Sequence, residues 1–83
     1  MNRSVAYLKE ILSNYMDKSH LGREIYSIIK TYDFTTESSF VEKLNEEQIA
    51  FLDEILPKEM AHAEEAGDEK RLMELNEIYE LLY

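Results

Sequence analysis

Apolar residues recur every three or four positions along most of the chain, which is the spacing of amphipathic helices. The first two stripes are Val5, Leu8, Ile11, Leu12 and Tyr15, then Leu21, Ile25, Ile28, Ile29 and Tyr32. Ser4 and Ser19 precede these stripes and are suited to cap them. We therefore expect helices from Ser4 to about Asp17 and from about His20 to Tyr32, packed as an antiparallel hairpin.

Beyond this hairpin the pattern predicts a connection, a short helix and a long helix. Phe34 is expected to enter the core from the connection, and Thr36 is expected to cap a short helix of about Glu37 to Leu44. The segment from Asn45 to Gln48 then has the form of a capping box. The apolar residues of the long helix that starts there are Ile49, Phe51, Leu52, Ile55, Leu56 and Met60.

Pro57 and Gly67 are the two residues expected to interrupt helices in the C-terminal part. A proline inside a helix costs about 3 kcal/mol. Because the apolar spacing continues past Pro57, we expect one kinked helix; the alternative is a break, with Pro57 starting a new helix. Gly67 is expected to end the long helix in a left-handed conformation, and Asp68 to cap a last helix from Glu69 to about Leu82. The inward residues of that helix are Leu72, Leu75, Ile78, Tyr79 and Leu82.

Together these patterns predict an all-α fold, a small orthogonal or antiparallel bundle of four to five helices in a single domain. Its parts are an N-terminal hairpin (1–34), a connection with a short helix (35–44) and an acidic hairpin (45–83). A chain of 83 residues buries a thin core rather than a deep enzyme cavity. It has no cysteine, no leader-like apolar segment and no apolar run near the roughly 18 residues of a membrane span, so we expect a cytoplasmic protein without a membrane partner.

The net charge of −9 is unevenly distributed. Residues 1–34 carry five Lys or Arg and four Asp or Glu, whereas residues 35–83 carry four and fourteen. This acidic half is expected to repel nucleic acid and to attract basic protein partners. The alternative is that the acids only keep a small protein soluble.

The sequence offers little that would perform catalysis, and we expect no enzyme, cofactor or metal. Glu59 and His62 have the Glu-x-x-His spacing of di-iron bundles, but such a site needs two of these motifs and two further carboxylates. His20 stands at a helix start without a nucleophile near it in sequence. Carboxylate pairs on a solvated helix face do not have the separated pKa values that acid–base catalysis requires.

Surface residues are better candidates for function. Tyr7 and Tyr26 fall off the main apolar stripes, and Tyr83 is the last residue, so these tyrosines are candidate contacts with a protein partner. The alternative is that their rings rim a thin core. The acidic candidates in the second half are Glu65, Glu69, Glu74, Glu77 and Glu80.

The C-terminal half also resembles a known family. The segments that carry the resemblance are Phe40-Val41-Glu42-Lys43-Leu44, Phe51-Leu52, Lys70-Arg71 and Glu74 to Leu82, with a looser match at Tyr7-Leu8 and Leu12-Ser13-Asn14. They are similar to the small sigma-G-dependent, sporulation-specific protein of bacilli, sometimes labelled an acid-soluble spore protein. The resemblance implies expression in the forespore and an intracellular location. It does not imply a DNA-coating role, which the net charge of −9 opposes.

From the sequence we therefore expect a non-enzymatic, sporulation-related helical protein that acts through a protein partner or as a homodimer. The alternative is an acidic mimic of DNA that inhibits a DNA-binding protein or a sigma factor.

Overall fold

Helices account for all of the regular secondary structure in residues 1–82, the part of the chain that the computed structural model describes. The elements are α1 (Arg3–Leu12), α2 (His20–Thr31), α3 (Glu37–Val41), α4 (Glu46–Glu65) and α5 (Glu69–Glu80). The predicted all-α fold is confirmed.

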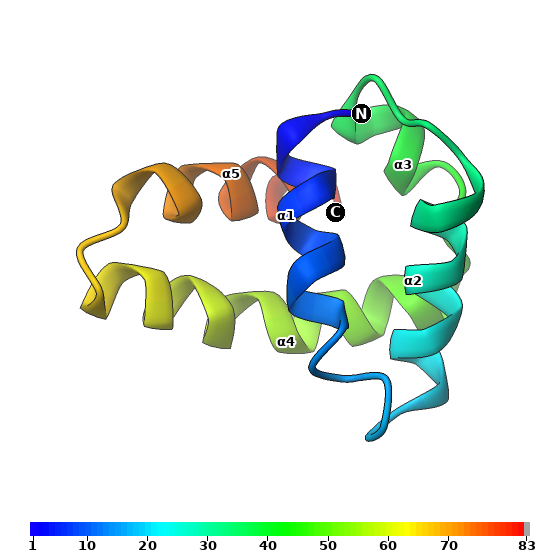
Figure 1. Cartoon of the computed structure of the whole chain (residues 1–83), viewed down its shortest axis with the longest axis horizontal. Coiled ribbons are helices and arrows are strands. Elements are labelled where there is room, and N and C mark those ends of the chain that lie inside the picture. Colours follow the sequence, from blue (N-terminus) through cyan, green and yellow to red (C-terminus); the bar gives the residue numbers. More distant parts are fainter. Residues whose placement is uncertain (83) are drawn as a thin grey trace.

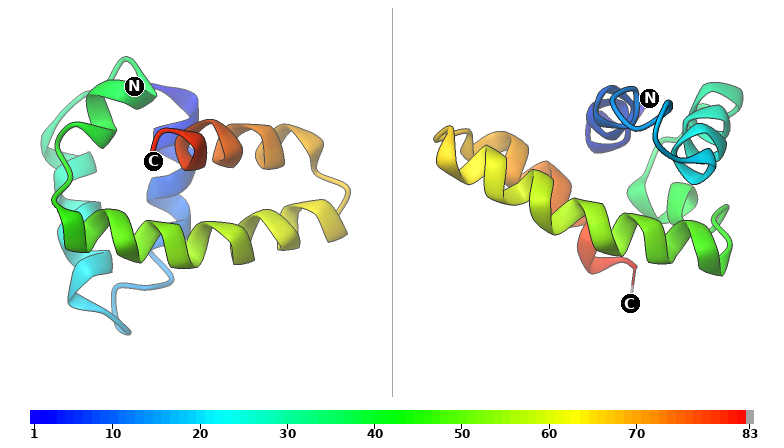
Figure 2. Two further views of the ribbon diagram at one scale, coloured as in Figure 1. Left: turned by 180° about the vertical axis from the view of Figure 1, so that it is seen from behind. Right: turned by 90° about the horizontal axis from the view of Figure 1, so that it is seen from below.

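The helices form two layers that cross steeply (Figure 1). One layer is the antiparallel pair α4–α5, and the other is the antiparallel pair α1–α2. Figure 2 shows α1 and α2 on one side of the α4–α5 hairpin, with α1 packed on α5 and α2 packed on α4. The short helix α3 contacts both α1 and α5, so it closes one end of the bundle.

A single core lies between these layers. Each predicted stripe contributes to it, and the side chains exposed by 4% or less are Val5, Leu8, Ile11, Leu12, Ile25, Ile29, Phe34, Phe40, Leu52, Ile55, Leu56, Leu75 and Ile78. Burial of one such side chain stabilises a fold by roughly 1.5–3 kcal/mol. The prediction that Phe34 enters the core is confirmed, whereas Tyr32, which falls on the predicted stripe of α2, is 45% exposed. Tyr32 is the C-cap of α2 in an extended conformation, so its side chain leaves the helical register.

The start and end of α1 differ from the prediction. Asn2, not Ser4, is the N-cap, and its side-chain oxygen accepts a hydrogen bond from the Val5 amide at 3.1 Å. Ser4 is buried inside the first turn. The helix ends at Leu12 rather than near Asp17, and residues 13–18 form turns.

A close approach of two backbones explains this early end. An added Cβ at Gly22 of α2 would lie 3.1 Å from both the backbone oxygen and the Cβ of Tyr15. The turn after α1 therefore lies directly against the first residues of α2, which a continued α1 would not allow.

The other predicted caps are confirmed. The side chains of Ser19, Thr36 and Asp68 each accept a hydrogen bond from an amide of the first turn that follows them. Asn45 and Gln48 form the full capping box, with bonds of 2.8 and 3.0 Å. The predicted short helix and the predicted last helix each end slightly early, at Val41 and Glu80.

Gly67 and Pro57, the two residues expected to interrupt the C-terminal helices, have different effects on the backbone. Gly67 has a φ of 70°, the predicted left-handed conformation between α4 and α5. Pro57 lies inside one continuous 20-residue helix, so the alternative of a break there is wrong. As a result, α4 presents a single uninterrupted outer face about 30 Å long.

Candidate interaction surfaces

The most continuous exposed surface on the long helix is its side away from the core. We call it the α4 outer face and define it by Glu47, Ala50, Glu54, Pro57, Ala61 and Glu65. All six residues are exposed, and they recur every three or four positions, which keeps them on one face of the helix. Three carboxylates therefore share this face with three short side chains.

The acidic charge of the molecule is concentrated on this helix. Between Glu46 and Glu65, α4 carries seven carboxylates and one lysine, Lys58. All of these carboxylates are exposed except Glu59, which is half-buried. By comparison, α5 carries four glutamates and two bases, Lys70 and Arg71. The negative charge is therefore denser along α4 than along α5.

The five glutamates selected from the sequence do not share one surface. Glu65 and Glu69 are exposed on either side of the turn at the tip of the α4–α5 hairpin. Glu74 and Glu77 approach the first turn of α1. Glu80 is exposed near the end of α5 and accepts a hydrogen bond from Asn76 at 2.8 Å. The sequence therefore identifies the acidic half of the chain, but the residues selected from it do not identify α4 as the helix with the most exposed carboxylates.

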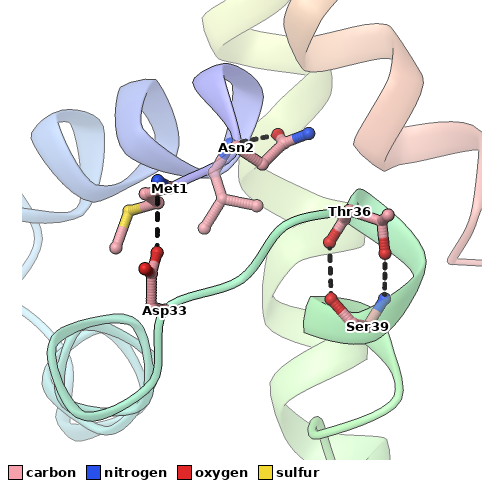
Figure 3. A network of polar contacts seen from close by, with 6 residues as sticks. Met1, Asn2, Asp33, Thr36 and Ser39 are labelled. Carbon is pink, nitrogen blue, oxygen red and sulfur yellow. Dashed lines mark hydrogen bonds and ion pairs between the residues drawn. The ribbon is translucent and has the colours of Figure 1, made fainter.

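Asn2 joins the start of α1 to the segment that leads into α3. Its backbone amide donates to the Phe34 carbonyl at 2.6 Å, and its side-chain amide donates to Glu37 Oε2 at 2.9 Å. Figure 3 shows the neighbouring contacts: the Met1 amine lies 3.1 Å from Asp33 Oδ1, and Thr36 and Ser39 exchange two hydrogen bonds at the start of α3. These contacts fix α3 beside the N-terminus of α1.

Three carboxylates meet at the same place. We call this group, formed by Glu37 of α3 with Glu74 and Glu77 of α5, the carboxylate junction. A side-chain hydrogen bond between Glu77 and Glu37 raises the pKa of Glu77, and the Ser4 hydroxyl, which donates to Glu77 Oε2 at 3.2 Å, opposes that rise. Burial and the charges of Glu37 and Glu74 raise the pKa of Glu77 further.

Glu74 adds an unusual feature to this group. Its Oε2 atom is buried and has no hydrogen-bond partner within residues 1–82. A buried acceptor without a donor costs free energy. Since α1 has no acidic residue in its own first turn, these glutamates also supply negative charge near its N-terminus.

Tyr7 is half-buried where α1 crosses α5. The guanidinium of Arg71 lies 4.4 Å from the centre of its ring, and Arg71 Nη1 donates to the Tyr7 hydroxyl at 3.2 Å. Arg71 Nε also lies 3.1 Å from Asp68 Oδ2. The hydrogen bond to Tyr7 holds the pKa of Arg71 above its ordinary value. A shallow groove of about 380 Å³ beside this stack is lined by Arg3, Ala6, Tyr7, Glu10, Asp68, Lys70, Arg71 and Glu74.

The other two tyrosine candidates differ from Tyr7. Tyr26 is half-buried on α2, with Lys9 Nζ 5.8 Å from its ring centre, and it lines a second groove of about 440 Å³ between α1 and α2. Tyr83 lies outside the described residues. Both Tyr7 and Tyr26 therefore combine packing at the rim of the core with partial exposure.

Tyr15 joins the turn after α1 to α4 through a hydrogen bond that the sequence did not predict. Its hydroxyl donates to Glu59 Oε2 of α4 at 2.9 Å, and its ring meets Phe51 edge to face at 5.9 Å. Burial, followed by the hydrogen bond to Glu59 and its charge, raises the pKa of Tyr15 to about 12. An apolar stripe predicts the inward ring, but it contains no information about the distant carboxylate.

The Glu-x-x-His pair has no further ligands around it. His62 Nδ1 lies 4.0 Å from Glu59 Oε2, and the His62 side chain is 71% exposed. Within residues 1–82 there is no group of three His, Cys, Asp or Glu residues that could hold a metal ion. His20, the other histidine, is exposed at the start of α2. No helix in this part of the chain is long and apolar enough to cross a membrane.

The family of the chain is shown by comparison with known proteins. A family model described as CsgA, minor curli fiber component A, matches residues 1–83. The chain belongs to this family. A relative from Bacillus subtilis (strain 168), named sigma-G-dependent sporulation-specific SASP protein, is 35% identical over 82 residues and covers 99% of both chains. The resemblance noted in the sequence is thereby confirmed. No solved structure matches the chain.

Proposed function

We propose that this family member is a non-catalytic, sporulation-related protein that binds a positively charged protein partner on the α4 outer face. The observation that carries the proposal is the continuous, exposed helix surface on which carboxylates are interspersed with Ala50, Pro57 and Ala61. Small side chains allow a partner helix or loop to approach closely, while the glutamates select basic residues.

The setting of the proposal comes from the Bacillus subtilis relative, whose name describes a sigma-G-dependent, sporulation-specific protein. At 35% identity over nearly the whole chain, a shared developmental role is the simplest expectation. We therefore propose that this chain acts in the forespore.

The family description, which names a fibre component, suggests assembly instead. We do not propose a fibre role, because residues 1–82 contain no β-strand whose unpaired edge would add another chain. Self-association through apolar surface is also less favoured. Large apolar side chains are exposed in this part of the chain only as single residues in different places. They are Met1 before α1, Tyr32 at the end of α2, Met73 in α5 and Leu81 just after α5.

Mimicry of DNA by the five glutamates of the second half is not supported by their placement. Glu74 is half-buried, and Glu77, although exposed, accepts a hydrogen bond from Ser4 of α1, so the two do not simply continue the exposed charge of Glu65 and Glu69 at the hairpin tip. The proposal therefore rests on α4 rather than on this set.

Affinity capture with matched baits tests the proposal. The first bait is the unchanged chain, and the second carries Glu47→Gln, Glu54→Gln and Glu65→Gln on the α4 outer face. A third bait carries Asp17→Asn, Glu42→Gln and Glu80→Gln, which are exposed positions outside α4 with the same total change in charge. Circular dichroism verifies that all three baits are folded.

The expected result is a basic protein from sporulating cells that the first and third baits retain and the second loses. Binding of that protein must then be reproduced with purified components. Equal capture by all three baits, or equal loss from the second and third, contradicts docking on α4. A homodimer that is unaffected by the α4 substitutions, with no captured partner, would indicate self-association through another surface.

A further inference from the structure

The outer side of α2 has the opposite charge to the α4 outer face. We call it the α2 outer face and define it by Arg23, Ser27 and Lys30, which are all exposed and recur at intervals of four and three positions. The one carboxylate of α2, Glu24, accepts a 3.1 Å hydrogen bond from Gln48 Nε2 and is directed toward α4 of the same chain. The α2 outer face is therefore cationic, although the whole chain has a net charge of −9.

The spacing of the charges on the two faces matches. Arg23 and Lys30 are seven positions apart, which is about 10.5 Å along a helix, and Glu47 and Glu54 of the α4 outer face have the same separation. When α2 of one copy lies antiparallel to α4 of another, Arg23 comes opposite Glu54 and Lys30 comes opposite Glu47. The Arg23 guanidinium donates one hydrogen bond to the Met16 carbonyl at 2.7 Å, which leaves further N–H groups for a carboxylate.

The middle of each face holds a short side chain, Ser27 on α2 and Ala50 on α4. Each lies three positions from one charged residue of its face and four from the other, and in the antiparallel register these intervals coincide. Two short side chains opposite each other let the helices approach closely. The single lysine of α4, Lys58, lies one turn beyond the paired segment. Charge and shape therefore favour the same register.

We propose that the α2 outer face of one copy docks on the α4 outer face of a second copy, so that copies join head to tail. This inference rests on the proposed function, since it names what covers the α4 outer face when no basic partner is bound. A basic partner and a second copy compete for the same carboxylates, so self-association regulates access to α4.

The two faces belong to different layers of the bundle. Figure 2 shows α2 on one side of the α4–α5 hairpin, whereas the α4 outer face is the side of that helix away from the core. A copy that uses its α2 outer face therefore keeps its own α4 outer face free. The contact is heterologous, because different surfaces of the two copies meet.

The net charge of −9 weakens this association without preventing it. At 0.15 M ionic strength, exposed charges separated by more than about 8 Å are largely screened, whereas opposite charges in contact across the interface still attract. Each added copy brings the same net charge, so we expect short oligomers that dissociate readily.

Sedimentation velocity of the purified chain at physiological salt tests the proposal, and the unchanged chain should form oligomers whose proportion rises with concentration. Arg23→Glu with Lys30→Glu should raise the dissociation constant about tenfold or more, because like charges then face each other. Arg3→Glu with Lys70→Glu is the matched control, since it makes the same change in net charge at exposed positions outside α2. The control should retain self-association, and circular dichroism verifies that each variant is folded.

A charge swap provides the second measurement. Glu47→Lys with Glu54→Lys should be monomeric alone, although its net charge is closer to zero than that of the unchanged chain. Mixed in equal amounts with the variant that carries Arg23→Glu and Lys30→Glu, it should associate, because each acidic face again meets a cationic one.

An unchanged chain that is monomeric at every concentration would overturn the head-to-tail contact. So would a charge-swapped mixture that stays monomeric, or equal association of the Arg23→Glu, Lys30→Glu variant and its control. These outcomes leave the proposed function standing, because that variant keeps its α4 outer face and should still capture the basic protein. Loss of this capture from an unchanged chain that still self-associates through α2 would contradict the proposed function alone.

Discussion

Asn2 Nδ2 donates a 2.9 Å hydrogen bond to Glu37 Oε2 although 35 positions separate the two residues. The same asparagine caps α1 through its side-chain oxygen. One side chain thus both begins the first helix and holds the third. The stability of the α1 N-terminus and the position of α3 are therefore coupled.

Replacing Asn2 by alanine should reduce the free energy of unfolding by about 1–2 kcal/mol, because the cap of α1 and the contact with Glu37 are both lost. Urea unfolding followed by circular dichroism measures this loss. Asn76→Ala is the control, since the Asn76 side chain donates to the exposed Glu80 of its own helix and alanine is a better helix former. A loss for Asn76→Ala as large as that for Asn2→Ala would contradict the capping role.

The raised pKa of Tyr15 predicts that the stability of the fold depends on pH in the alkaline range. Its pKa is raised from 10.0 to about 12 in the folded protein, so the folded state retains a proton that the unfolded state has already released. The stabilisation from the neutral phenol is complete below the unfolded pKa, and stability falls as the pH rises from 10 toward 12. Tyr15→Phe should remove this part of the alkaline decline, as measured by thermal unfolding across that pH range. A decline identical in Tyr15→Phe would show that Tyr15 does not cause it.

A glycine is required at position 67 because of its backbone conformation and not because a side chain there would clash with a neighbour. Its φ is 70°, yet an added Cβ would meet nothing within 4 Å. Gly67→Ala should therefore cost about 1–2 kcal/mol through the left-handed backbone alone. Gly67→Asn should cost less, because asparagine tolerates this conformation better. Equal stability of the glycine and alanine forms in urea unfolding would exclude the left-handed turn.

Pro57 lies in the interior of α4 and cannot donate an amide hydrogen bond. Pro57→Ala should stabilise the fold by about 2 kcal/mol, the proline penalty of about 3 kcal/mol less the added entropy of the unfolded chain. Thermal and urea unfolding measure this gain. Ala61→Gly, one turn further along, should instead destabilise the protein by about 1 kcal/mol, and a similar response to both changes would contradict a continuous α4.

The helices were predictable because local rules determine them. The stripe from Val5 to Leu12 needs only a helical period, and Asn45 with Gln48 needs only a capping box. The cap of α1 was misplaced because Ser4 and Asn2 are both good cap residues. Ser4 instead contacts Glu77, a partner 73 positions away that no local pattern shows.

The candidate surfaces were less predictable for the same reason. Sequence identified the acidic half, but only the packing of α1 on α5 brings Glu77, which stays exposed, within hydrogen-bond distance of Ser4. Ala50 and Ala61 were not selected from the sequence, because their place between acids on one outer face became apparent only once α4 proved continuous through Pro57.

The most direct test of α4 as the docking surface is the salt dependence of binding between the purified chain and its captured partner. The dissociation constant should rise steeply with salt for the unchanged chain, because charged groups dominate the encounter. Glu47→Gln, Glu54→Gln and Glu65→Gln together should weaken binding and flatten the salt dependence, whereas the Asp17→Asn, Glu42→Gln and Glu80→Gln control should leave both nearly unchanged. Binding that is independent of salt and unaffected by the α4 substitutions would contradict the account.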